Sequence, residues 1–229
     1  MKKLVRVSLF VLMALTLSLA IGCKHDSDPE PAPADVAGKN DPASANFVGT
    51  WLSPDGELTC TITTDKFTTK VGGDVEFPGT YTVSGTTLTT SEITLPQEFG
   101  GQKMKFTMKL KDGESDVMEL PLPEEMGGNA ILVKKSTENV NLDGTWTGKV
   151  DIDENGTLGD ATIVFANNKA TVTVPGKTGP ETVTETVTRD GNFFTITFED
   201  DPDRGELRGL ISASGKAWLV GGYVFTKQQ

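Results

Sequence analysis

Apolar and polar residues alternate along most of the chain after residue 46. Residues 58–63 and 67–71, for example, place every second side chain on one face and are rich in threonine. Such alternation is typical of β-strands buried on one side, and no stretch shows the apolar spacing of a helix. Glycine-containing turns separate the runs, which predicts an all-β protein with antiparallel strands. The other strand-like runs are 81–83, 86–94, 104–110, 129–134, 161–165, 170–174, 182–187, 192–199, 207–212 and 223–227.

The strand-rich part of the chain consists of two similar halves. Residues 46–51 (NFVGTW) are echoed 95 positions later by residues 141–146 (NLDGTW). We therefore expect two domains, 46–135 and 141–229, joined by the polar link 136–140 and each able to fold alone. We expect about eight short strands in each half, and closing them into a small antiparallel barrel leaves no bare sheet edge. A β-sandwich of two sheets is the alternative.

Residues 1–22 have the layout of a secretory signal peptide. A basic head is followed by an apolar stretch, 7–21, that is short for a membrane span, and then by Gly22. Residues 19–23 (LAIGC) resemble the lipobox of bacterial lipoproteins, although Ala20 stands where leucine is commonest. The resemblance implies that Cys23 carries the lipid and becomes the first residue after cleavage. An ordinary signal peptide and an uncleaved anchor helix are the alternatives.

The segment after Cys23 is suited to a tether. Residues 23–45 contain four prolines and almost no large apolar side chain, so they cannot bury enough surface to offset the entropy of ordering. This interpretation places the protein in the bacterial cell envelope, lipid-anchored to a membrane. The outer membrane is favoured, and either of its faces is open.

The charge of the chain narrows the choice of partners. There are 32 acidic and 21 basic residues, for a net charge of −11. An acidic body argues against nucleic acid as the main partner, because phosphate backbones attract basic surfaces. The membrane, contacted through the lipid, and an unidentified protein or small hydrophobic ligand remain as expected partners.

The two Gly-x-Trp motifs, Gly49-Thr50-Trp51 and Gly144-Thr145-Trp146, resemble the opening of the first barrel strand in lipocalins, avidins and related calycins. The run from residue 49 to residue 85 also looks like short lipocalin-like domains of bacterial surface lipoproteins. The resemblance implies up-and-down barrels in which Trp51 and Trp146 each close one end by packing across the core. Each copy is shorter than a true lipocalin, and no C-terminal helix is apparent.

Few residues suggest catalysis or metal binding. The only histidine, His25, falls in the tether, and Cys60 shares an apolar face with its neighbours, which favours a buried thiol over a reactive one. Asp151, Asp153 and Asn155 match the first half of a calcium loop but lack the closing glutamate, so a polar hairpin turn is favoured. The acidic run 199–206 is interpreted as a solvated loop. Core packing is favoured over a pocket lining for Trp51, Trp146, Trp218, Phe67, Tyr81, Phe165, Phe194 and Phe198.

We accordingly expect a protein that binds rather than catalyses and that needs no cofactor. Three hypotheses remain: a protein-binding surface component, a carrier of a small hydrophobic ligand in a barrel interior, and a structural envelope spacer. A vacant apolar interior would favour the carrier, whereas an exposed apolar patch would favour protein binding.

Overall fold

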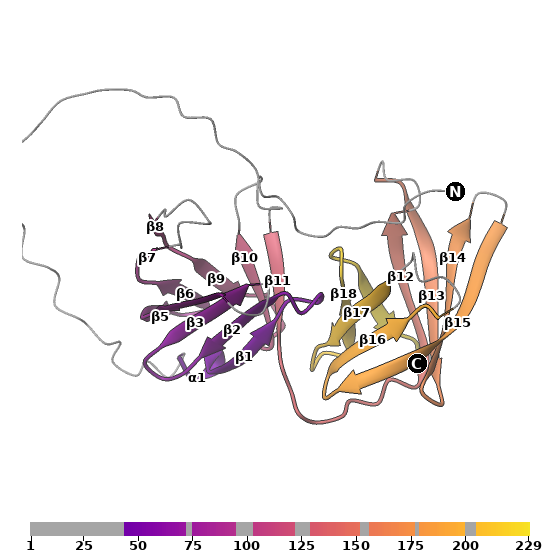
Figure 1. Cartoon of the computed structure of the whole chain (residues 1–229), viewed down its shortest axis with the longest axis horizontal. Coiled ribbons are helices and arrows are strands. Elements are labelled where there is room, and N and C mark those ends of the chain that lie inside the picture. Colours follow the sequence, from indigo (N-terminus) through magenta and orange to yellow (C-terminus); the bar gives the residue numbers. More distant parts are fainter. Residues whose placement is uncertain are drawn as a thin grey trace, which may run out of the picture.

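The structure is a computed structural model that describes residues 44–71, 75–94, 103–121, 129–151, 156–176, 179–199 and 205–229. The predicted signal peptide, Cys23 and nearly all of the predicted tether lie outside these residues. One short helix, α1 (Ser44–Phe47), precedes two antiparallel sheets, which Figure 1 shows side by side. The prediction of an all-β protein is confirmed.

The second half of the chain forms a closed barrel of eight strands. Each strand pairs with the next along the chain, and the last returns to the first through the pair Trp146↔Lys227. Closure leaves no sheet edge along the ring, and it confirms a barrel rather than a sandwich. The strands are β12 (Gly144–Asp151), β13 (Leu158–Ala166), β14 (Lys169–Gly176), β15 (Gly179–Asp190), β16 (Phe193–Thr197), β17 (Glu206–Ile211), β18 (Lys216–Leu219) and β19 (Val224–Lys227).

The first half forms a nine-stranded sheet that is nearly closed. Its strands follow the order β4-β3-β2-β1-β11-β10-β9-β6-β5, and a separate two-stranded sheet joins β7 to β8. The strands are β1 (Gly49–Leu52), β2 (Leu58–Ile62), β3 (Phe67–Val71), β4 (Val75–Gly79), β5 (Tyr81–Ser84), β6 (Thr87–Thr90), β7 (Ile93–Thr94), β8 (Lys103–Met104), β9 (Thr107–Leu110), β10 (Val117–Pro121) and β11 (Asn129–Lys134).

The first barrel has the strand order of the second, with its fourth strand broken. In the second barrel, β15 pairs with β14 along its first part and with β16 along its last part. In the first barrel, β4 pairs with β3 and β5 pairs with β6, and only Thr80 separates β4 from β5. The pairs Trp51↔Lys134 and Trp146↔Lys227 then occupy the same place in the two barrels. The repeat seen in the sequence is therefore a repeat of structure.

Three sequence-based expectations for the first barrel differ from the structure, and none of the expected runs covers β10 or, in the second barrel, β18. The expected run 86–94 divides into β6 and β7, and the run 104–110 divides into β8 and β9. The side chain of Thr90 accepts a hydrogen bond from the Phe106 backbone N–H at 2.9 Å at this division. Strand β4 was not expected, since it contains Pro78; proline lacks the N–H that a central strand donates, and β4 lies at the edge of its sheet.

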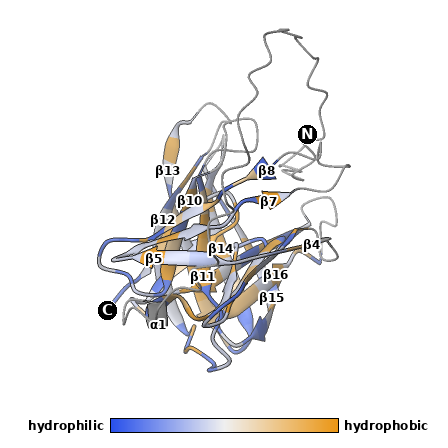
Figure 2. Cartoon of the chain, turned by 90° about the vertical axis from the view of Figure 1, so that its left-hand side faces the viewer, coloured by the Kyte–Doolittle hydropathy of each residue, from blue (hydrophilic) through white to orange (hydrophobic). Residues whose placement is uncertain are grey.

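Each barrel encloses its own apolar core. Figure 2 shows hydrophobic and hydrophilic residues mixed along the strands, as expected when alternate side chains point inward. The fully buried side chains of the first core include Phe47, Trp51, Phe67, Leu88, Met108, Met118 and Leu132. Those of the second include Trp146, Phe165, Phe194, Ile196 and Phe225.

A third apolar cluster joins the two barrels. Val117 and Val133 of the first barrel pack with Leu210 and Trp218 of the second, and each side chain is at most 5% exposed. Figure 1 shows β17 and β18 on the side of the second barrel that faces β10 and β11. We call this group the interface cluster; its partly buried members are Leu52, Ile131, Phe193 and Val224.

Candidate binding surface

The two tryptophans of the Gly-x-Trp motifs have the same environment in both barrels. Trp51 is fully buried and its Nε1 donates to the Phe47 carbonyl at 2.8 Å; Trp146 is 1% exposed and its Nε1 donates to the Leu142 carbonyl at 2.8 Å. A lysine from the last strand of each barrel, Lys134 or Lys227, extends over the indole with its Nζ 5.5 or 5.7 Å from the ring centroid. These contacts tie the first strand of each barrel to its last.

The motif glycines allow this lysine to approach. A Cβ atom added to Gly49 would lie 2.6 Å from Lys134 Cε, and one added to Gly144 would lie 2.9 Å from Lys227 Cε. Sequence reasoning missed both lysines. The signal that could have found them is their spacing, because each follows its tryptophan by just over 80 residues, at the end of its copy.

Aromatic side chains pack against one another in the interior of the second barrel. Phe165 packs edge-on against both Trp146 and Phe194, with ring centroids 6.3 and 5.5 Å apart. In the first barrel, Phe67 is 1% and Tyr81 8% exposed, and the Tyr81 hydroxyl donates to the Thr63 carbonyl at 2.5 Å. Two of the expected core aromatics differ. Trp218 points away from its barrel and into the interface cluster, and Phe198 is only half-buried and belongs to neither core.

Cys60 is a buried thiol. It is fully buried in the first core, and its Sγ lies 3.5 Å from Thr69 Oγ1. Burial raises the pKa of the Cys60 thiol to about 11, which the contact with Thr69 only partly offsets. The thiolate, which is the reactive form, is therefore scarce near neutral pH.

The structure places only part of the candidate calcium loop. Asp151 ends β12, and its carboxylate accepts a hydrogen bond from the Gly156 N–H at 3.1 Å across the turn. Asp153 and Asn155 lie outside the described residues, as do residues 200–204 of the acidic run. Among the residues that the structure describes, no group of three or more His, Cys, Asp or Glu side chains could hold a metal ion.

The hairpin of β12 and β13 extends beyond the wall of the second barrel. The ladder from β12 to β19 ends at Gly148, and the ladder from β13 to β14 ends at Thr162. Past these points the two strands pair only with each other, as far as Asp151↔Leu158. The equivalent strands of the first barrel, β1 and β2, are shorter, so this extension belongs to the second copy alone.

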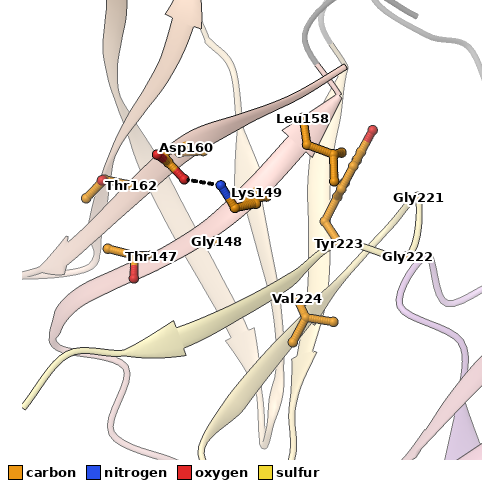
Figure 3. Close-up of a pocket in the computed structure, with 11 residues that line it drawn as sticks. Thr147, Gly148, Lys149, Leu158, Asp160, Thr162, Gly221, Gly222, Tyr223 and Val224 are labelled. Atoms are coloured by element: carbon orange, nitrogen blue, oxygen red, sulfur yellow. Dashed lines mark hydrogen bonds and ion pairs between the residues drawn. The ribbon is translucent and has the colours of Figure 1, made fainter. Parts of the chain in front are cut away.

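A depression of about 830 Å³ lies beside this extended hairpin (Figure 3). Its polar part contains Thr147, Thr162 and the ion pair between Lys149 Nζ and Asp160 Oδ1, which are 2.7 Å apart. Its apolar part contains Val224, Tyr223 and Leu158, and the Leu158 side chain is 57% exposed. The depression therefore combines an exposed leucine and a tyrosine with an ion pair.

The turn between β18 and β19 positions Tyr223 in this depression. Gly221 and Gly222 have φ values of +85° and +80°, which residues with a side chain rarely adopt. A Cβ added to Gly221 would lie 2.9 Å from Tyr223 Cε2, so glycine allows the tyrosine ring to lie against the turn. We call this depression, with Leu158 and Tyr223 as its apolar residues, the outer site. Sequence reasoning did not find it.

Two comparisons with known proteins found no match. No model of a known protein family matches the chain, and no curated protein matches it either. Within the described ranges there is no helix with the length and apolar character required to cross a membrane.

Proposed function

We propose that the chain is a bacterial envelope lipoprotein, anchored through acylated Cys23, whose two barrels bind a partner without catalysing a reaction. The anchoring rests on the sequence of residues 19–23 and on the proline-rich segment after it. The binding role rests on one observation, the outer site, where Leu158 is exposed beside Tyr223 on a barrel whose core contains Trp146, Phe165 and Phe194.

The location of the outer site favours a protein partner over a ligand carried inside a barrel. A carrier needs vacant apolar volume, whereas Trp146, Phe165 and Phe194 occupy the interior of the second barrel. The outer site is shallow and combines apolar side chains with an ion-paired rim, as protein contact surfaces do.

The anchoring is tested at the cysteine. Cys23→Ser should abolish the incorporation of labelled palmitate and move the protein from the membrane fraction to the soluble fraction. The reason is that serine offers no thiol for the lipid. Cys60→Ser is the matched control and should leave labelling unchanged, since that thiol is buried. Full labelling of the Cys23→Ser variant would rule out this anchor.

The binding role is tested with a photo-reactive residue placed at position 158 in living cells. We expect a discrete cross-linked product in several-fold greater yield than from the same residue at position 164. Val164 is a suitable control because it is also exposed, at 37%, on the outer face of β13 but does not border the depression. Tyr223→Ala should reduce the product from position 158. Equal yields from both positions would contradict the outer site.

A further inference from the structure

The two barrels face each other through surfaces that are not equivalent. The first barrel contributes the outer face of β1, β10 and β11, and the second contributes the outer face of β16, β17, β18 and the start of β19. The apolar residues of the interface cluster alternate with residues of the two cores. Val117 and Leu210, for example, belong to the interface, whereas the next residues, Met118 and Ile211, belong to the cores.

The repeat allows each interface position to be compared with the same position in the other copy. The pairs Trp51↔Lys134 and Trp146↔Lys227 set the alignment, and the strand ladders extend it across both sheets. Six of the eight positions of the interface cluster have a polar residue in the other copy. The six pairs, with the interface residue first, are Leu52 and Thr147, Val117 and Lys216, Val133 and Thr226, Phe193 and Thr87, Leu210 and Lys109, Trp218 and Glu119.

The difference between the copies follows contact and not fold, except at Lys216, which is polar and still contacts Glu114 of the first barrel. Ile131 and Val224, the remaining two positions, are each other's counterparts and are apolar in both. At the other six positions, the barrel fold accepts a polar side chain. The second barrel carries the polar residue at three of these positions, and the first barrel carries it at the other three. Thr147, Thr226 and Lys109 are exposed where the equivalent residue in the other barrel is covered. Apolar residues thus occur where the opposite barrel removes water.

Polar contacts surround the cluster and fix the orientation. Glu114 of the first barrel accepts hydrogen bonds from Lys216 Nζ at 2.6 Å and from Ser214 Oγ at 2.9 Å. Arg208 Nη1 donates to the Asp55 carbonyl at 3.0 Å. Asn192 Oδ1 accepts a hydrogen bond from the Ser136 N–H at 2.8 Å, and Asn192 Nδ2 donates one to the Lys134 carbonyl at 2.9 Å. These bonds hold the start of the link against the second barrel.

We propose that the outer face of β1, β10 and β11 is a binding surface whose partner is the outer face of β16–β18 of the second barrel, and that the two hold together without the covalent link. The barrels then form one rigid unit that presents the outer site in a fixed orientation to the first barrel. Divergence between the copies creates this surface and also prevents each barrel from binding another copy of itself, because equivalent faces are not complementary.

The test cuts the link after the full chain has folded. A protease recognition sequence is inserted between Glu138 and Asn139, both exposed, and the purified protein is cleaved. We expect the two fragments to co-elute in size-exclusion chromatography at micromolar concentration, at the volume of the uncut protein. If the interface residues are unchanged and the two fragments separate or precipitate after the link is cleaved, the proposal is overturned.

Variants taken from the other copy make the test specific. Trp218→Glu and Leu210→Lys introduce the residues that the first barrel carries at these positions, so the barrel fold can accept them. Each should release the fragments after cleavage, with at least a tenfold weaker association, and should increase the radius of gyration of the uncut chain. Val164→Thr is the control, since it makes the same kind of exchange outside the interface. Co-elution that survives both interface variants would also contradict the proposal.

Discussion

Trp146→Ala should lower the free energy of unfolding by about 3–5 kcal/mol, the cost expected for truncating a buried tryptophan. The side chain is 1% exposed, and its removal would leave a cavity beside Phe165. The variant would also lose the hydrogen bond to the Leu142 carbonyl and the contact with Lys227. Chemical denaturation followed by far-ultraviolet circular dichroism measures the change.

The repeat supplies matched controls for this prediction. Trp51→Ala should cost a similar amount, because Trp51 makes the same hydrogen bond and the same lysine contact in the first barrel. Trp146→Phe should cost less than Trp146→Ala, since it keeps an apolar ring and loses only the indole N–H bond. If Trp146→Ala kept full stability and lost binding of a partner, the residue would belong to a binding site and not to the core.

Lys216→Met should destabilise the protein by about 1–3 kcal/mol near neutral pH, because it leaves the Glu114 carboxylate without its counter-charge while the hydrogen bond from Ser214 remains. The Glu114 side chain is only 3% exposed, whereas that of Lys216 is 40% exposed. Glu114→Gln should therefore cost less, because the lysine it leaves can reach water. Lys149→Met, which breaks the exposed pair with Asp160, is the control and should change stability by less than about 1 kcal/mol.

The same pair predicts different responses to acid in the wild-type protein and the variant. Burial by itself raises the pKa of Glu114, but the hydrogen bonds from Lys216 and Ser214 and the charge of Lys216 outweigh it and lower the pKa. A lowered pKa in the folded state adds stability above the unfolded-state pKa, and this stability is lost as the pH falls through the folded-state pKa.

In Lys216→Met, the hydrogen bond and the charge of Lys216 no longer lower the pKa of Glu114, whereas burial, which raises it, and the hydrogen bond from Ser214 remain. The stabilising contribution of Glu114 therefore becomes smaller, and mild acid should reduce the difference in stability between the variant and the wild type. Denaturation midpoints measured from pH 7 down to pH 4 would show the two curves converging. A constant difference across this range would mean that Glu114 does not depend on Lys216.

Much of the fold could be predicted from the sequence because local chemistry specifies it. Alternation identified most strands, and two of them, β3 and β11, have the predicted bounds. The turn residues placed the hairpins, and the echo of residues 46–51 in 141–146 identified the repeat. Strand β4 was missed since Pro78 argues locally against a strand, and only its place at the edge of the sheet makes the proline acceptable.

The contact between the barrels is reflected in the sequence by apolar residues at neighbouring positions, which strand alternation alone does not predict. Val117-Met118, Leu132-Val133, Leu210-Ile211 and Trp218-Leu219 are adjacent apolar pairs within strands, so both faces of these strands are buried. Such pairs indicate a second covering layer without identifying it. The identity of that layer depends on which outer faces meet, and this is a property of residues 60 or more positions apart in the chain.

The sequence by itself determined the strand class, the turns, the repeat and the polar face of each barrel, because these depend on residues within a few positions of one another. Tertiary structure alone decided that Lys134 and Lys227 cover the tryptophans, that Trp218 points out of its barrel, that Glu114 meets Lys216, and that Leu158 and Tyr223 share a depression. Each of these contacts joins residues from different strands or different barrels. Their meeting is set by closure and docking, and local patterns do not identify which strands or faces meet.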